Sequence, residues 1–117
     1  MKTGLPLQER QCLACSKDTP PLDRSMAQQL VGELHPDWSL ADDGNSITRC
    51  YAFTDYYQTM AFVNALAWIA HREDHHPDIE VSYRRCHVRY STHMIGGLSE
   101  NDFICAAKID ALLPAGD

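Results

Sequence analysis

The chain of 117 residues has the length of one domain, because single domains most often contain about 100–150 residues. Its 44% hydrophobic and 22% charged residues are typical of a globular protein with its own core. A formal net charge of −6 argues against nucleic acid as the main partner, since phosphate binding depends on clustered Lys and Arg. No apolar stretch approaches the ~20 residues of a membrane span and the N-terminus is polar, so we expect a cytoplasmic protein with no membrane partner.

The N-terminal segment differs in composition from the rest of the chain. Residues 1–21 contain glycine and several prolines without a sustained apolar period, which predicts a loosely structured leader before a single domain over residues 22–117. Apolar residues then recur at helical spacing over residues 22–34, where Ser25 offers a cap and Pro36 prevents continuation. The domain is therefore predicted to begin with a helix.

A hairpin and a long helix are predicted next. Residues 38–40 and 47–53 flank the polar turn at residues 42–45, where Gly and Asn tolerate positive φ. Residues 55–73 show an apolar face at helical spacing, and Pro77 follows them. The sequence thus predicts two antiparallel strands followed by a second helix.

The last third of the chain predicts two more strands and a final helix. Residues 79–83 and 88–93 alternate between apolar and polar side chains. Ser99, with Asp102 three residues later, forms the pattern of a capping box before the last helix, which Pro114 closes. The order α-β-β-α-β-β-α indicates an α+β domain in which helices pack against a four-stranded antiparallel sheet.

Four histidines are the candidate functional residues. His71 and His75 are four residues apart, on one helix face, and His76 follows at the helix exit. His93 is predicted to end a strand on the side away from the core, so one pocket at the end of the sheet could hold all four imidazoles. Each could also be a solvent-facing polar residue. Zinc binding by the i, i+4 pair is disfavoured because Arg72 stands where the zinc peptidase pattern requires Glu, and no metal is predicted.

The spacing of these residues resembles the signature of the pterin-4a-carbinolamine dehydratases. The run His71-x3-His75-His76-Pro77 is followed by Tyr83, His93 and Asp102 at intervals of six, ten and nine residues. The segments STH, GLSENDF and AAKID also resemble that family, as does the predicted order of elements over about residues 22–113.

The resemblance implies an α+β fold with three helices on one face of a four-stranded antiparallel sheet. It also implies dehydration of 4a-hydroxytetrahydropterin to quinonoid dihydropterin without a cofactor, in support of tetrahydrobiopterin recycling. Its catalytic positions fall on His75, His76 and His93, and its substrate-binding positions on Asp74, His71, Asp102 and Ile79. The family often has Glu at the position of His71 and an aromatic residue at that of Ile79, so these two contacts depart from its pattern.

Acid–base chemistry explains why imidazoles suit this reaction. Hydroxide is a poor leaving group, so an acid must protonate it while a base removes a proton from the neighbouring ring nitrogen. Our hypothesis assigns the acid to His75, the second proton transfer to His93 and ring orientation to His76, and an exchange of these roles among the three histidines is the alternative. Asp74 either raises the pKa of a neighbouring imidazole or is a solvated turn residue. Asp102 is predicted to serve mainly as the cap partner of Ser99.

The five cysteines are an odd number in a chain without an export signal, which predicts reduced thiols. The pair Cys12 and Cys15 lacks the further ligands of a closed zinc site and is expected to be a surface thiol pair.

Some relatives of this family act as dimerisation cofactors of transcription factors, so the alternative function is a protein-binding module or transcriptional coactivator. A pure interaction protein has no physical need for these histidines, which favours the enzyme. Small antiparallel sheets leave edges that need covering, and together with the resemblance this predicts a homo-oligomer, either a dimer or a tetramer.

Overall fold

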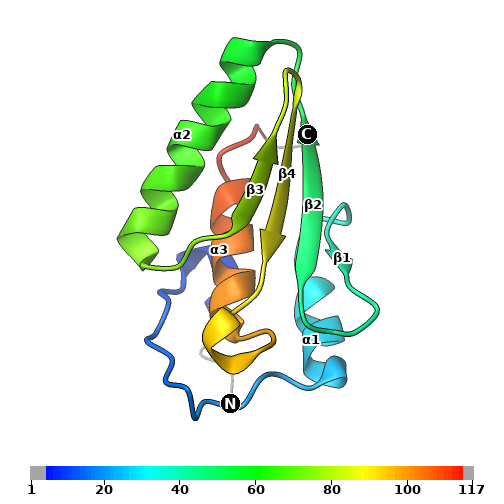
Figure 1. The fold of residues 1–117 in the computed structure, drawn as a ribbon, viewed down its shortest axis with the longest axis vertical. Helices are drawn as coiled ribbons and strands as arrows, with labels where there is room; N and C mark the ends of the chain where they lie inside the picture. Colours follow the sequence, from blue (N-terminus) through cyan, green and yellow to red (C-terminus); the bar gives the residue numbers. More distant parts are fainter. Residues whose placement is uncertain (1–4, 115–117) are drawn as a thin grey trace.

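The computed structural model describes residues 5–114 and forms an α+β fold (Figure 1). Its elements in chain order are η1 (Leu7–Glu9), α1 (Arg24–Val31), β1 (Ser39–Leu40), β2 (Ile47–Ala52), α2 (Tyr56–Glu73), β3 (Asp78–Val81), β4 (Arg85–Tyr90), η2 (His93–Ile95) and α3 (Glu100–Asp110). The four strands form one antiparallel sheet in the order β1-β2-β4-β3. The predicted fold class and element order are confirmed. Among the described residues, no helix is long and apolar enough to cross a membrane.

The core lies between one face of the sheet and the helices. In β4 the side chains of Cys86, Val88 and Tyr90 are buried and the intervening residues are exposed, as the two-residue period of a strand requires. Figure 1 shows α2 running along the sheet with α3 beside it. Residues 101–106 of α3 are all buried, so the helix that carries Asp102 is the most enclosed element of the site.

Most predicted ends of helices and strands are within three residues of the observed ones, and three local features differ from the prediction. Helix α1 is capped by Asp23 rather than Ser25, because the Asp23 carboxylate accepts a hydrogen bond from the Met26 amide. Strand β3 ends at Val81 rather than at residue 83, which leaves Tyr83 at the tip of the following hairpin and 60% exposed. His93 does not end a strand.

Strand β4 stops at Tyr90 because the chain closes a short loop after it. The amide of Thr92 donates to the carbonyl of Gly97 at 2.8 Å, and the residues between them form η2. Gly96 ends this turn with φ 67°, a conformation that glycine adopts without a steric penalty. His93 therefore begins a 3-10 turn, from which its side chain projects into solvent.

The described part of the N-terminal segment carries little regular structure but packs on the domain. Residues 5–15, here called the strap, contain η1, whose Leu7 is 3% exposed and joins the core. Lys108 of α3 donates to the carbonyl of Gln8, and Arg10 pairs with Glu100 at 2.7 Å. In this respect the structure differs from the expectation of a loose leader, because α3 supplies partners for the strap. Residues 1–4 lie outside the described residues.

Candidate active site

The end of α2 determines where the first histidines point. Asp74 follows the helix in a left-handed conformation, with φ 53° and ψ 43°, and is the only non-glycine residue with positive φ in the described range 5–114. The amide of His75 donates back to the carbonyl of Ala70, which satisfies a terminal carbonyl of the helix. The chain then leaves the helix axis, with the side chain of His75 mostly buried and His76 exposed.

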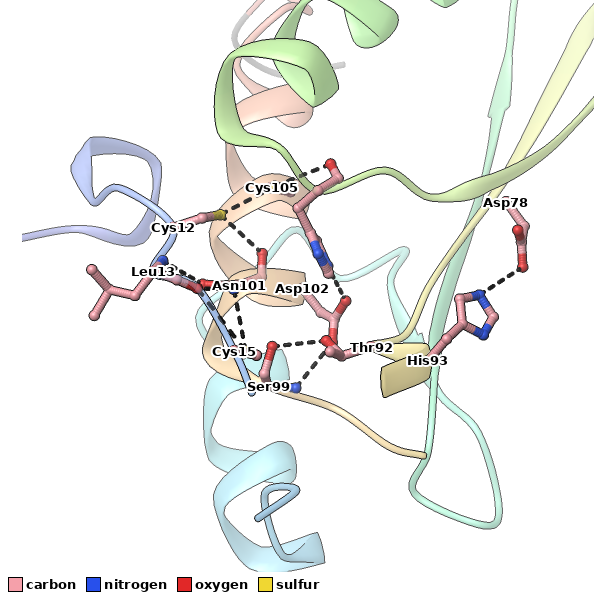
Figure 2. A network of polar contacts seen from close by, with 11 residues as sticks. Cys12, Leu13, Cys15, Asp78, Thr92, His93, Ser99, Asn101, Asp102 and Cys105 are labelled. Atoms are coloured by element: carbon pink, nitrogen blue, oxygen red, sulfur yellow. Dashed lines mark hydrogen bonds and ion pairs between the residues drawn. The ribbon is translucent and has the colours of Figure 1, made fainter. Parts of the chain in front are cut away.

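A hydrogen bond joins His75 to Asp102 in the first turn of α3. The Nε2 atom of His75 lies 2.6 Å from Oδ1 of Asp102, and the two side chains are 14% and 0% exposed. The other oxygen, Oδ2, accepts from the hydroxyl of Thr92 at 2.8 Å and the amide of Ser99 at 3.0 Å (Figure 2). Asp102 is thus the predicted cap partner of Ser99 and also the partner of His75.

The environment of His75 favours its protonated form. Burial lowers the pKa of His75, but the hydrogen bond and negative charge of Asp102, together with the charges of Cys105 and Asp74, outweigh burial. The pKa is therefore raised above the ordinary value of an imidazole. The His75 ring also stacks on Tyr90, with ring centroids 5.8 Å apart and planes inclined by 8°. A charged, oriented imidazolium at this position is a suitable proton donor.

A cleft of about 590 Å³ opens in front of this imidazole. It is lined by residues 12–15 of the strap, residues 72–76 at the end of α2, residues 91–94 and Asn101. Of the predicted site residues, the cleft is lined by Asp74, His75, His76 and His93.

The other three predicted residues lie outside the cleft wall. Asp102 is fully buried behind His75. His71 is exposed on α2, where its ring stacks on Trp68 at 5.5 Å. Ile79 is 40% exposed on β3, opposite Val88 of β4. The structure therefore brings four of the seven predicted residues to the cleft and one more directly behind it.

His93 stands apart from the Asp102 cluster. Its Nε2 atom lies 3.9 Å from Oδ2 of Asp78, and both side chains are more than half exposed. Figure 2 shows His93 and Asp78 facing each other on the side away from Asp102. Sequence reasoning missed Asp78, although its position directly after His75-His76-Pro77 was an available signal.

The strap is the second feature that sequence reasoning missed. The amide of Cys12 donates to the carboxylate of Glu73 at 2.9 Å. The amide and carbonyl of Leu13 both bond the side chain of Asn101, at 3.0 and 2.6 Å. These bonds fix an N-terminal segment as one wall of the cleft.

The two thiols of the strap do not form the expected surface pair. Cys12 is half-buried, with its Sγ 3.5 Å from Sγ of Cys105 in α3, while the thiol of Cys15 contacts Leu13 and Asn101. Within the described residues, no group of three or more His, Cys, Asp or Glu side chains is arranged to hold a metal ion.

A larger hollow of about 950 Å³ lies between α2 and β2. Its lining is mostly apolar, with Asp37 and Arg49 as the charged residues, and it contains no histidine. The smaller histidine-lined cleft is therefore the better candidate for proton-transfer chemistry.

Comparison with known proteins identifies the family of this chain. Residues 20–112 match the family described as pterin 4 alpha carbinolamine dehydratase. A protein of Nitrosomonas eutropha is 57% identical over 92% of this chain and 93% of its own, and one of Xanthomonas campestris pv. campestris is 54% identical over 96% and 94%. Both carry the name "Putative pterin-4-alpha-carbinolamine dehydratase".

Solved structures show the same fold. A protein of Brucella melitensis described as a transcriptional coactivator/pterin dehydratase has a TM-score of 0.76 and 30% identity, covering 80% of this chain and 99% of its own. A pterin dehydratase-like protein described as a RuBisCO assembly factor in the alpha-carboxysome has a TM-score of 0.59 and 28% identity, covering 71% and 94%. By sequence and by fold, the chain belongs to the pterin 4 alpha carbinolamine dehydratase family.

Proposed function

We propose that this protein dehydrates 4a-hydroxytetrahydropterin to quinonoid dihydropterin in the cleft lined by His75, His76 and His93. Family membership supports a pterin substrate. The observation that carries the acid–base mechanism is the hydrogen bond between His75 and the fully buried Asp102, because it favours a charged imidazole beside the cleft.

In the proposed reaction two imidazoles transfer protons in opposite directions. His75 donates its proton to the hydroxyl on the saturated ring carbon, the carbon–oxygen bond breaks and water leaves. His93 accepts the proton from the neighbouring ring nitrogen, and the carbon–nitrogen double bond of the product forms. The two imidazoles then regain their starting states by proton exchange with solvent, which reaches the 68% exposed side chain of His93. His76, exposed on the cleft wall, orients the ring.

The proposed product determines the biological role. Quinonoid dihydropterin is the form that a reductase returns to the tetrahydro state. The enzyme would therefore support tetrahydrobiopterin recycling, and pterin would be its small-molecule partner.

We also propose that the protein is a dimer or tetramer. Strand β3 is at the edge of the sheet and all four of its side chains are exposed, including Ile79 and Val81. A partly apolar sheet edge favours pairing with another strand. Light scattering that showed a monomer at micromolar and higher concentrations would contradict this proposal.

The decay of 4a-hydroxypterin absorbance tests the function directly. The intact protein is expected to accelerate the decay over buffer, and His75→Ala to lose most of that acceleration. His35→Ala is the matched control, because His35 lies outside the cleft and its ring bonds the Asp37 amide. A protein that gave no acceleration would be better explained as a binding module, a role that the coactivator description of the Brucella melitensis protein favours.

A further inference from the structure

Two thiols meet directly behind the cleft, at the junction of the strap and α3. The Sγ atoms of Cys12 and Cys105 are 3.5 Å apart, which is van der Waals contact. Cys105 lies one helical turn after Asp102 and is fully buried, whereas Cys12 is partly exposed on the cleft wall. The proposed dehydration uses neither thiol.

Hydrogen bonds of the strap and of Cys105 keep the two sulfur atoms in contact. The Cys12 amide is bonded to Glu73 and the next residue, Leu13, is bonded twice to Asn101. The Cys105 thiol contacts the carbonyl of His75 at 3.9 Å. The contact between the thiols is therefore part of an ordered interface rather than a chance approach of two flexible side chains.

The pKa values of the two thiols are shifted in opposite directions. The hydrogen bond to Cys105 and burial raise the pKa of Cys12. The same hydrogen bond lowers the pKa of Cys105, despite burial, and the charge of His75 acts in the same direction. Either sulfur can be the donor in this contact, so Cys105 can accept the Cys12 proton and leave the thiolate that thiol–disulfide exchange requires.

We propose that Cys12 and Cys105 are a reversible modification site, at which a low-molecular-weight disulfide of the glutathione type oxidises them to an intramolecular disulfide that fixes the strap on α3. The sulfur atoms must approach from 3.5 Å to the ~2.05 Å of a disulfide. The strap is the segment that moves, since Cys105 is enclosed by the core.

The exchange balances in two steps. Cys105 loses its proton to solvent and accepts the proton of Cys12, whose accessible sulfur attacks the small disulfide and expels one small thiolate. Cys105 then loses this second proton to solvent, attacks the Cys12 sulfur and expels the second small thiolate. The protein loses two electrons and two protons in all, and the small disulfide is reduced to two thiols.

Cys15 could compete with Cys105 as the disulfide partner of Cys12. It is separated from Cys12 by two residues, a spacing at which cysteines form disulfides in redox proteins. However, its Sγ contacts the Leu13 carbonyl and the Asn101 amide. The structure therefore favours the long-range pair, which joins residues 93 positions apart, over the local one.

Peptide mass mapping after incubation with oxidised glutathione tests the proposal. We expect a Cys12–Cys105 cross-link as the dominant disulfide, removed by dithiothreitol. The cross-link should raise the Tm on the order of 10 °C, because it closes a long loop in the unfolded chain. Cys12→Ala and Cys105→Ala should abolish the rise, and Cys50→Ala, on β2, should retain it.

Three results would overturn the proposal: a dominant Cys12–Cys15 cross-link, glutathione adducts without any cross-link, or a rise in Tm that persists in Cys12→Ala. Cys105 is in the core, so Cys105→Ala could itself impair folding. In that event the partly exposed Cys12→Ala decides the question alone. None of these measurements depends on pterin turnover, so they remain informative even if the proposed function is wrong.

Discussion

The Nε2 atom of His75 lies 2.6 Å from Oδ1 of Asp102, although 27 positions separate the two residues in the chain. His75 comes just after α2 and Asp102 comes from the first turn of α3. Because Thr92 and Ser99 occupy the other carboxylate oxygen, Asp102 has a fixed orientation and can hold the imidazole in one place.

Asp102→Asn should lower the pKa of His75, since it removes the negative charge that raises it. As a general acid, His75 is active while protonated, so the loss of turnover at high pH should move to lower pH. NMR titration of the His75 ring and the pH profile of kcat measure both effects. Asp42→Asn, in the exposed hairpin turn, is the control, and an unchanged profile in Asp102→Asn would contradict the assignment.

The same pair links stability to pH. Because the folded-state pKa of His75 is raised, its stabilising contribution is complete below the unfolded-state value of ~6.5 and is lost as pH rises through the folded-state pKa. The difference in unfolding free energy between the native protein and Asp102→Asn should therefore shrink over that range. Urea unfolding at a series of pH values gives the difference, and a gap that widened with rising pH would rule out this linkage.

His75→Ala and His93→Ala should each lower turnover by about 10²-fold or more, the usual contribution of a positioned acid or base. His76→Ala should mainly raise KM. His35 and His87 lie outside the cleft, so His35→Ala and His87→Ala should leave turnover nearly intact. Steady-state kinetics of all five variants measure these effects, and equal, small losses in all of them would mean that the site is elsewhere.

Asn101→Ala should raise KM by roughly 3–10-fold with a smaller change in kcat, because it removes two hydrogen bonds to Leu13 that hold the strap. Asp42→Ala is the control, because Asp42 is exposed in the hairpin turn and lies outside the cleft and the strap. Steady-state kinetics of both variants make the comparison. A fall in kcat of the same roughly 3–10-fold size, with KM unchanged, would instead assign Asn101 a role in the chemical step.

Prolonged dialysis against a chelator should leave activity unchanged, because the proposed reaction needs only proton transfer. The measurement is turnover together with metal content before and after dialysis. Tightly bound zinc in a one-to-one ratio, with loss of activity on its removal, would reverse the assignment.

Local patterns predicted most of the fold. The apolar face over residues 55–73 and the capping box at Ser99 and Asp102 both depend on residues a few positions apart, and the structure contains both. The apolar–polar alternation continues to residue 93, but the strand ends earlier because the Thr92 amide donates to the Gly97 carbonyl in a short loop. Alternation alone does not reveal such a loop. The boundary error therefore moved His93 from a strand to a turn.

The histidine constellation was recognisable from its spacing, but its geometry was not. The left-handed conformation of Asp74 aims His75 toward α3, and aspartate is one of several residues that adopt it, so the sequence does not specify it. The strap was beyond prediction because Glu73 and Asn101, which order it, are 61 and 88 positions from their partners. The periodicity of apolar residues reports on neighbours along the chain and carries no information on such long-range partners.

The long separation between the strap and Asn101 also affects when the cleft can form. Joining residues 88 positions apart costs loop-closure entropy, and the cost falls once the intervening chain is folded. The strap should accordingly dock last during folding and detach first under mild destabilisation, as a local opening that leaves the sheet and α3 intact. Such a local opening would free one wall of the cleft without global unfolding and would give a rigid pterin ring a path into and out of the cleft.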